Sequence, residues 1–379
     1  MKNIINKLFI IFICLIPFGS FFFKQVDIWH GQGQFVQVGI LIFFCCSFFE
    51  KPKYIQILNK PLGVFTLWAG LVTSYWWIKV FFITQHYPIK VFFPFFNLLC
   101  LILLYKLIIE YLDKKSIERI LNYLRYSIII ILFYCVLQYL KLDEFYKGIV
   151  SGEKLNELVG IMGNRGHMAG FLTIIQPIFF RKELLNILSL ILLWFIIFLT
   201  GSASALFVGI SIILFWLLMK RKYIFFMLGL FSSIILFAFI YFKFPVFFND
   251  NFRFTVWSKA IEMIKKKPIT GYGLGFFGVN KLSIYGHGQF QHLHNEWLQI
   301  ILELGFIGLI FVLWIVWDYF NIFIKNINDL TIKLASIFFG FCILSMFLFP
   351  AHLWVIATTA MFCYAGIYAI KNEVISENP

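Results

Sequence analysis

Apolar stretches long enough to cross a lipid bilayer recur along the whole chain. A helix needs about 20 apolar residues to span a hydrocarbon core of about 30 Å, and only helices or closed barrels satisfy their backbone hydrogen bonds in lipid. The stretches lack the alternation of apolar and polar residues that barrel strands show. With 61% hydrophobic and only 13% charged residues, the chain is also unlike a soluble multidomain protein. We therefore predict an all-α polytopic membrane protein.

Twelve segments qualify as membrane-spanning helices on this pattern. They are residues 5–23, 35–49, 62–80, 91–109, 126–140, 167–180, 184–200, 203–219, 223–241, 297–317, 331–349 and 353–370. The first segment is similar to a signal peptide, but no small-residue cleavage motif follows it, so we keep it as a span. We expect one transmembrane domain over residues 1–379 with two long outer loops, at 141–166 and 242–296.

Lysine and arginine predict how these helices are oriented. With the N-terminus inside, the short inner loops carry most of these residues, as the positive-inside rule requires. Both termini should then be cytoplasmic, and the protein should lie in the cytoplasmic (inner) membrane. The net charge of +14 reflects this bias and an attraction to anionic membrane lipids, so we expect no nucleic-acid partner. The seven cysteines fall within predicted spans, as small buried apolar residues do.

The histidines all gather on one predicted side of the membrane. Each lies in an outer loop or at the outer end of a span; they are His30, His86, His167, His287, His292, His294 and His352. Histidine is the side chain that exchanges protons most readily near neutral pH. Any proton-transfer chemistry is therefore expected at the outer face.

The long loop at 242–296 contains an amphipathic segment, RFTVWSKAIEMIKKK, at residues 253–267. Helical spacing puts Phe254, Trp257, Ile261 and Ile264 on one face, with charged residues opposite, which predicts a helix lying in the bilayer interface. Arg253 falls in its first turn. From spacing alone, Arg253 is either a surface residue that snorkels to water or a residue of the site.

A glycine-rich run, PITGYGLGFFG, follows at residues 268–278. Gly273, Gly275 and Gly278 match the dinucleotide-binding pattern, but that pattern requires a preceding buried strand in a βαβ unit. We therefore interpret Gly273 and Gly275 as positions where the backbone turns tightly or approaches a ligand closely.

Three histidines are crowded into GHGQFQHLHNEW, residues 286–297. A zinc site is conceivable, but no acidic or cysteine ligand stands at metal spacing, so we expect no metal and no cofactor. Beyond them, Glu296, Gln299 and Glu303 form a polar stripe on an apolar helix. Charged groups at that depth are costly, so the stripe should face protein or a water-filled cavity.

The sequence HNEWLQIILELGFIG carries the strongest motif of the chain. His294 and Asn295 are followed by nine residues, then Gly305, two more residues and Gly308. This spacing resembles the signature of the O-antigen ligase and O-antigen polymerase superfamily. Upstream residues resemble the same family in their order, namely Arg253, Trp257, Pro268, Gly271, Gly273 and Phe276 or Phe277.

Two further segments resemble that family, and one position departs from it. GIMGNRGHMAGFL at 160–172 is similar to the family's Gly-Asn segment, and LTGSASA at 199–205 to its Thr-Gly-Ser segment. Family members usually have arginine after that serine, where Ala203 stands here. Arg165 could substitute for the missing arginine.

The resemblance implies a GT-C-like, metal-independent glycosyltransferase acting at the periplasmic face on a glycan linked to a polyprenyl diphosphate. Arg253, and secondarily Arg165, would hold the diphosphate. His294 would be the catalytic base, and inversion at the anomeric carbon is expected. Glu296 and Glu303 would orient the base or bind sugar hydroxyls. Asn295, Gly273, Gly275 and His167 complete the expected substrate-binding set.

The acceptor stays open between alternatives. A ligase would use the glycolipid lipid A core, a polymerase another lipid-linked glycan, and an oligosaccharyltransferase a protein hydroxyl. The His-Asn motif favours a ligase. The short segment after the last span disfavours the oligosaccharyltransferase, which usually has a long outer C-terminal region. A transporter or flippase is the alternative from another class, but such proteins place charges and broken helices at mid-membrane.

Overall fold

The computed structural model describes residues 2–19, 28–47, 60–84, 89–142, 158–243, 253–280 and 292–377, and these residues form helices with no strand among them. His86 and His287 lie outside the described residues, as do parts of both predicted outer loops. The all-helical prediction is confirmed for the described part of the chain.

The helices follow one another along the chain much as the predicted segments do. They are α1 (Lys2–Leu15), η1 (Ile16–Phe18), α3 (Ile28–Ser47), α4 (Lys60–Thr84), α5 (Ile89–Tyr111), α6 (Lys114–Tyr139), η4 (Gly160–Met162), α7 (Arg165–Ile175), η5 (Gln176–Phe179), α8 (Leu184–Leu199), α9 (Ala203–Met219), α10 (Tyr223–Lys243), α11 (Arg253–Lys266), α12 (Phe276–Asn280), α13 (Glu296–Lys325), α14 (Asp329–Leu344), η7 (Pro350–His352) and α15 (Trp354–Glu377). Each of the twelve predicted segments overlaps a helix, but the predicted segment 331–349 continues past the end of α14 at Leu344.

Four helical segments in the described residues are long and apolar enough to cross a membrane: Phe93–Tyr111, Lys114–Tyr139, Glu296–Lys325 and Trp354–Glu373. Shorter apolar helices, such as Leu184–Leu199 and Ala203–Met219, accompany them. The chain is therefore a helical membrane protein, while the number of twelve crossings and their orientation stay predictions.

Helix ends follow local capping chemistry. Asp113 accepts a hydrogen bond from the Ser116 amide at the start of α6, which therefore begins well before the predicted span at 126–140. Asn328 and Thr331 form a reciprocal capping box at the start of α14. Such caps satisfy amides that would otherwise lack a partner in the first turn of a helix.

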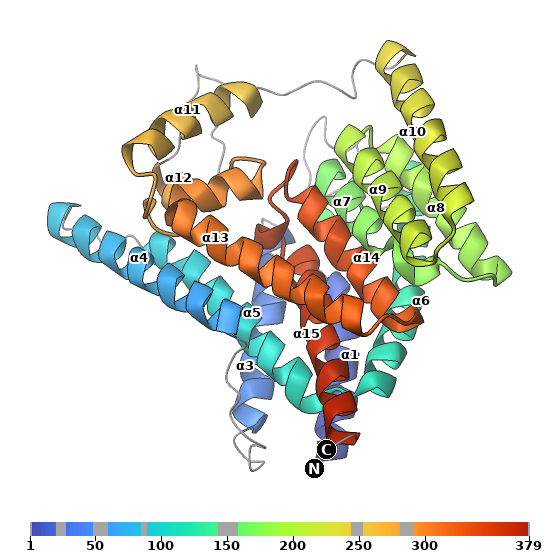
Figure 1. The fold of residues 1–379 in the computed structure, drawn as a ribbon, viewed down its shortest axis with the longest axis horizontal. Coiled ribbons are helices and arrows are strands. Elements are labelled where there is room, and N and C mark those ends of the chain that lie inside the picture. Colours follow the sequence, from blue (N-terminus) through green and yellow to red (C-terminus); the bar gives the residue numbers. More distant parts are fainter. Residues whose placement is uncertain are drawn as a thin grey trace.

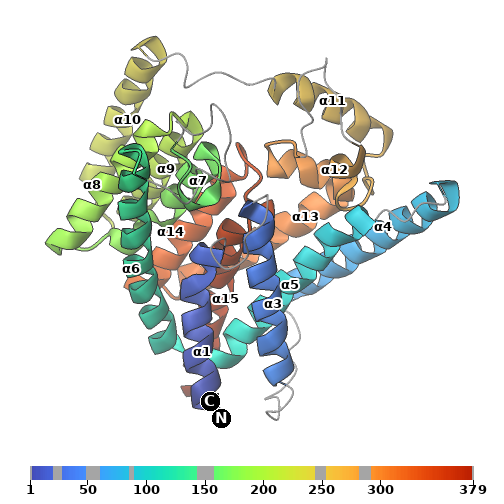
Figure 2. The same ribbon diagram turned by 180° about the vertical axis from the view of Figure 1, so that it is seen from behind.

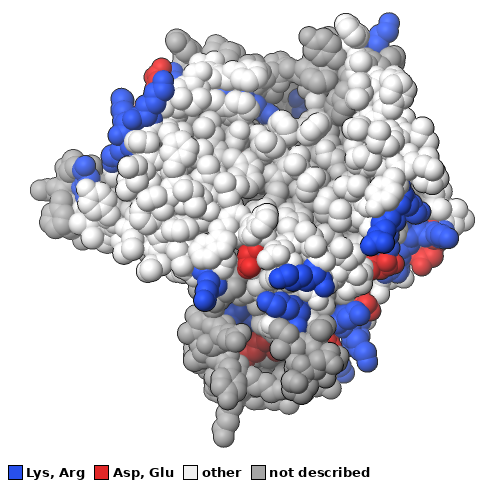
Figure 3. All heavy atoms as spheres, viewed as in Figure 1, with Lys and Arg blue, Asp and Glu red and all other residues white. Residues whose placement is uncertain are grey.

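The helix α15 lies at the centre of the bundle, packed against α5, α13 and α14 (Figures 1 and 2). The two termini lie together at one end of the molecule, and α11 and α12 lie at the opposite end. Outward-facing side chains of α8 and α10 are large and apolar, among them Ile191 (61% exposed) and Ile224 (75% exposed). Figure 3 shows the same surface as a broad uncharged band with lysine and arginine toward its edges, as expected for a lipid-facing belt.

Candidate functional site

Four histidines from three separate segments gather around the ring of Phe349. The ring centroid of Phe349 lies 5.1 Å from that of His167, 4.4 Å from His292 and 4.9 Å from His294. His352 lies farther from Phe349, at 6.5 Å, but 4.2 Å from His292. The fold thus brings His167 of α7, the segment before α13 and the α14–α15 connection to one place.

The backbone at His294 adopts an unusual conformation. Its φ is +53°, in the left-handed region that few residues other than glycine adopt. Asn295 follows as the N-cap of α13, and its side chain accepts a hydrogen bond from the Leu298 amide at 3.0 Å. The His-Asn pair of the motif therefore has a local structural meaning. His294 turns the chain and Asn295 begins the helix.

His294 is held in its neutral form. Burial, and secondarily the positive charge of Arg253, lower its pKa from an ordinary value of 6.5 to about 4. Burial also keeps the pKa of the neighbouring His292 well below its usual range, with His352 and His294 adding to the effect. A neutral imidazole at pH 7 can accept a proton, which is the state that a general base requires.

Arg253 begins α11 and reaches toward the same site. Its Nη1 donates a hydrogen bond to the Phe347 carbonyl at 3.3 Å, two residues before the Phe349 ring. One turn further along α11, the indole Nε1 of Trp257 donates to the Leu293 carbonyl at 2.7 Å. The structure therefore brings Arg253 and His294, the two expected catalytic residues, into one site.

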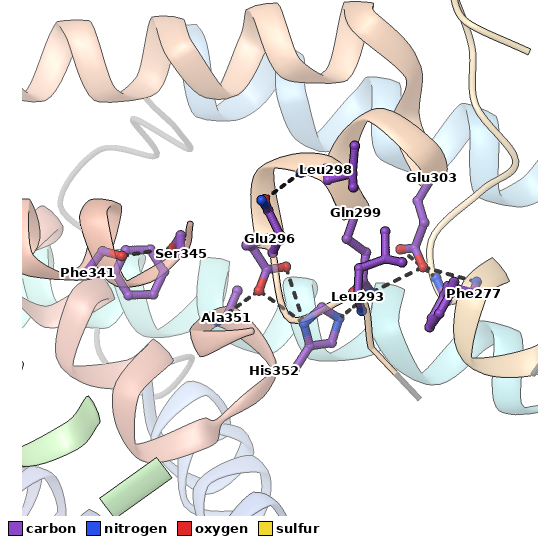
Figure 4. A network of polar contacts seen from close by, with 12 residues as sticks. Phe277, Leu293, Glu296, Leu298, Gln299, Glu303, Phe341, Ser345, Ala351 and His352 are labelled. Atoms are coloured by element: carbon purple, nitrogen blue, oxygen red, sulfur yellow. Dashed lines mark hydrogen bonds and ion pairs between the residues drawn. The ribbon is translucent and has the colours of Figure 1, made fainter. Parts of the chain in front are cut away.

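The polar stripe at the start of α13 faces protein, as expected. Glu296, Gln299 and Glu303 are 6%, 2% and 2% exposed. The Glu296 carboxylate accepts the Ala351 amide at 3.3 Å and forms an ion pair with His352 Nδ1 at 3.3 Å. Figure 4 shows this pair beside Gln299, whose Nε2 lies 3.5 Å from His352 Nε2.

Glu303 closes the other end of this network. Its Oε2 accepts the Gly275 amide at 2.9 Å, and its Oε1 accepts the Phe277 amide at 3.3 Å (Figure 4). Gln299 Nε2 also donates to Glu303 Oε1 at 3.3 Å, and the Leu293 amide donates to Gln299 Oε1 at 3.1 Å. Glu303 is thus bonded to the glycine-rich segment, and a role in binding substrate stays a prediction.

The glycines of that segment pack against protein. A Cβ added at Gly273 would lie 2.8 Å from Trp76 Cβ, and one at Gly275 would lie 2.7 Å from Pro94 Cγ. Both have positive φ, +93° and +76°. Of the two sequence-based interpretations, tight turning accounts for the observed geometry, and contact with a ligand stays a prediction.

The helix α11 is amphipathic, but its buried face differs from the predicted apolar face. Val256, Ala260 and Ile264 are buried, whereas Phe254 and Ile261 are 63% and 45% exposed. The apolar pattern did not distinguish residues that pack on protein from residues that could face lipid. Phe254 and Ile261 are exposed and are therefore available to contact a membrane interface.

Arg165 is exposed in the first turn of α7, where the Asn164 side chain caps the helix by accepting the Gly166 amide at 2.8 Å. His167, one turn into the same helix, is buried against Phe349. Ala203 begins α9 after the capping residue Ser202. That Arg165 compensates for the arginine absent at Ala203 stays a prediction.

Sequence reasoning missed three contributors to this site, Phe349, His352 and Gln299. His352 had been noted only as an outer histidine, and Gln299 only as part of the stripe. Phe349 gave no signal, because it ends an apolar run rich in phenylalanine. Within the described residues, no group of three or more His, Cys, Asp or Glu could hold a metal ion, and independence from metals stays a prediction.

A cavity of about 240 Å³ lies between α4, α5, α13 and α15. Glu296 and His352 are part of its wall, and most of the remaining wall is apolar, for example Leu98 and Val312. The buried ion pair therefore borders both the histidine cluster and an apolar chamber of the membrane domain.

Comparison with known proteins gives a family match that covers part of this site. The family described as O-antigen ligase matches residues 188–313, which include Arg253 and His294. The ComP-specific O-oligosaccharyltransferase of Acinetobacter baylyi is 31% identical over 218 residues, which are 50% of this chain and 39% of that protein.

Two rickettsial proteins that are provisionally named polysaccharide ligases are also similar. The protein of Rickettsia felis is 29% identical over 138 residues, 33% of this chain and 34% of its own length. That of Rickettsia conorii is 29% identical over 138 residues, 33% of each chain. The matched part of this chain thus spans about two fifths or less of the length of these relatives.

Proposed function

We propose that this chain, whose residues 188–313 match the O-antigen ligase family, transfers a glycan from a polyprenyl diphosphate carrier to an acceptor hydroxyl. The observation that carries the proposal is the neutral, partly buried imidazole of His294 beside the permanent cation of Arg253. Glycosyl transfer from a diphosphate requires such a pair, a base for the acceptor and a cation for the leaving group.

The chemistry assigns one task to each residue. The acceptor hydroxyl attacks the anomeric carbon while His294 takes its proton. The bond between that carbon and the carrier diphosphate breaks, and the departing lipid diphosphate gains negative charge. Arg253 binds that charge through its guanidinium group, which suits phosphate oxygens. Attack from the face opposite the leaving group inverts the anomeric centre, and no metal enters the scheme.

The apolar cavity beside Glu296 and His352 supports a lipid-linked substrate. Its wall is almost entirely hydrocarbon, as the chain of a lipid carrier requires. The active site would lie at the outer face of the cytoplasmic membrane, with both termini in the cytoplasm. A cysteine introduced at Gly286 should then react with a reagent that does not cross the membrane, and labelling only after the membrane is opened would contradict this orientation.

Among acceptors we favour a glycolipid of the lipid A core type, the reaction of a ligase. A polysaccharide polymerase is the second candidate within the superfamily. Transfer to a protein hydroxyl is favoured by one observation, since a relative with 31% identity is named an O-oligosaccharyltransferase.

Reconstitution separates these reactions. Purified protein in liposomes would receive a polyprenyl-diphosphate oligosaccharide, with lipid A core, with an acceptor protein or alone. A single product that depends on lipid A core supports the ligase. A ladder of sizes without any second acceptor would indicate a polymerase, and a glycoprotein would indicate an oligosaccharyltransferase.

The matched variant is His294→Asn, because asparagine tolerates the left-handed backbone at this position. It should lower transfer by about 100-fold to 10,000-fold while the protein stays folded. A variant that joins glycans normally, or wild-type protein that moves lipid-linked glycan across the bilayer without joining it, would contradict the proposal and favour a flippase.

A further inference from the structure

The segment that carries His294 is fixed at the peptide groups next to it. The Leu293 carbonyl accepts the Trp257 indole N–H at 2.7 Å, and the Leu293 amide donates to Gln299 Oε1 at 3.1 Å. On the other side, the Glu296 amide donates to the Ser345 carbonyl at 2.7 Å. Both polar groups of Leu293, the residue directly before His294, are therefore bonded to side chains that lie elsewhere in the fold.

Each of those two side chains is itself held. Trp257 lies on α11 one turn after Arg253 and packs edge to face on Phe254, with ring centroids 5.4 Å apart. Gln299 is fully buried, and its amide donates to Glu303 Oε1 at 3.3 Å. Glu303 in turn accepts the Gly275 and Phe277 amides, so the amide of Gln299 cannot rotate without losing a bond.

The geometry points to a positioning function for Trp257, Gln299 and Glu303, which together hold the Leu293 peptide so that His294 faces the site that Arg253 shares. We call these three side chains the Leu293 brace. This inference rests on the proposed function and deepens it. It takes Glu303 as a residue that orients the base through other groups rather than one that binds sugar.

The brace has a physical reason to exist. A base on a left-handed, non-glycine backbone has a strained conformation that surrounding contacts must stabilise. The base and the phosphate-binding cation are also on different segments, α11 and the start of α13. The Trp257–Leu293 bond joins those segments directly, and an error of about 1 Å between two reacting groups can lower a rate by about 100-fold.

The test uses substitutions that remove one hydrogen-bonding group each. Trp257→Phe removes the indole N–H, and Gln299→Met removes the amide in a side chain of similar length. Trp68→Phe is the matched control, since Trp68 Nε1 also donates to a backbone carbonyl, that of Leu304, at 3.0 Å. That bond joins α4 to α13 and does not touch the His294 segment.

We expect Trp257→Phe and Gln299→Met to lower kcat by about 10-fold to 100-fold while KM for the donor changes by less than about threefold. Trp68→Phe should leave kcat within about twofold and lower the melting temperature by as much as Trp257→Phe. Equal kcat in Trp257→Phe and Trp68→Phe would overturn the brace.

A second readout does not depend on transfer. Hydrogen–deuterium exchange of the peptide containing Leu293–Glu296 should be faster in Trp257→Phe and Gln299→Met than in wild-type protein, and unchanged in Trp68→Phe. Unchanged exchange in all three would also overturn the brace. If wild-type protein transfers no glycan yet exchange responds as expected, the brace stands and the proposed function fails.

Discussion

The imidazole of His294 meets the ring of Phe349 edge to face, with ring centroids 4.9 Å apart. The same phenylalanine contacts His167 and His292 on its other sides. A buried aromatic ring contributes no charge and excludes water, so it favours the neutral form of each histidine that it touches. Phe349 is thus the common neighbour that makes one environment for side chains from two distant parts of the chain.

The pH dependence of transfer should report that environment. Because burial, aided by Arg253, lowers the pKa of His294 to about 4, kcat/KM should be constant from pH 7 to about pH 5. It should be halved near pH 4 and fall by about tenfold per pH unit below that. Arg253 acts on His294, and His352, His294 and His167 act on His292.

The stability of the protein must be measured over the same pH range as its activity, because the lowered pKa of His294 also makes the free energy of unfolding depend on pH. Its pKa is lower in the folded state than the unfolded value of 6.5. Its contribution to stability is therefore complete above pH 6.5 and is lost as pH falls through about 4. Melting temperature across the same range distinguishes titration from unfolding. An activity limb centred at pH 6.5 in folded protein would mean that a solvent-exposed group controls the rate.

Phe349→Leu should lower both activity and stability. Leucine keeps most of the apolar volume but loses the four ring contacts to histidine, each worth about 0.5–1.5 kcal/mol at most. We expect the free energy of unfolding to fall by about 1–3 kcal/mol and kcat by about 10-fold or more as His294 moves.

The control for Phe349→Leu is Phe339→Leu. Phe339 lies on α14 and stacks on Phe215 with ring centroids 4.5 Å apart, away from the histidines. It should lose stability without a comparable loss of kcat. Equal kcat in the two variants, measured in the reconstituted transfer assay, would exclude a special role for Phe349.

Local sequence information was sufficient for the helices and for part of the site. Each predicted apolar segment overlaps a helix because its length and composition are properties of the segment itself. The motif also placed His294 and Arg253 in one expected site, and in the structure the charge of Arg253 acts on His294. The start of α6 was predicted least accurately. Its first turns are charged, and the helix begins after the Asp113 cap rather than at an apolar residue.

The rest of the site depends on contacts between distant segments. Phe349 is one phenylalanine among 51, and only its position next to three imidazoles distinguishes it. Glu303 was expected to face protein or a water-filled cavity, but the sequence did not indicate that its carboxylate would bond the amides of Gly275 and Phe277. No spacing rule connects those positions. On α11, periodicity shows that a face is apolar but not what covers it: Ile264 of that face packs on protein, whereas Phe254 and Ile261 are exposed.

The Glu296–His352 pair should make stability depend on pH in the opposite sense to His294. Burial alone would lower the pKa of His352, but the attraction of Glu296 and the hydrogen bond between them outweigh burial and raise it. The stabilising effect of the pair is therefore complete below pH 6.5 and is lost as pH rises through the raised pKa.

Glu296→Gln should remove most of that dependence. The free energy of unfolding at pH 6 should fall by on the order of 3 kcal/mol, because His352 loses its main partner. The melting temperature at pH 6 should fall accordingly. The decline of wild-type stability at higher pH should become smaller, because Glu303 is then the remaining attraction on His352. A variant whose melting temperature follows that of wild-type protein at every pH would show that the pair contributes nothing.

Gly305 lies at a kink in α13, and its substitution should be severe for two separable reasons. Its φ of +70° and ψ of −177° lie in a region that essentially only glycine adopts, which costs an L-residue on the order of 1–3 kcal/mol. A Cβ there would also lie 1.9 Å from the Ile269 carbonyl oxygen, a backbone atom that cannot rotate away. Gly201 has a similar φ, +67°, but no atom within 4 Å of the added Cβ. Gly201→Ala therefore measures the conformational cost alone.

We expect Gly201→Ala to lower the free energy of unfolding by about 1–2 kcal/mol and Gly305→Ala by distinctly more. The excess arises because the segment at 268–272 must move off α13, breaking the bonds from Phe306 N to Pro268 O and from Tyr272 N to Leu302 O. Since Glu303 adjoins this kink, transfer should fall as well in Gly305→Ala only. Thermal unfolding in detergent micelles, followed by tryptophan fluorescence, gives the comparison. Similar melting temperatures for the two variants would mean that the kink relaxes freely and does not hold the glycine-rich segment against α13.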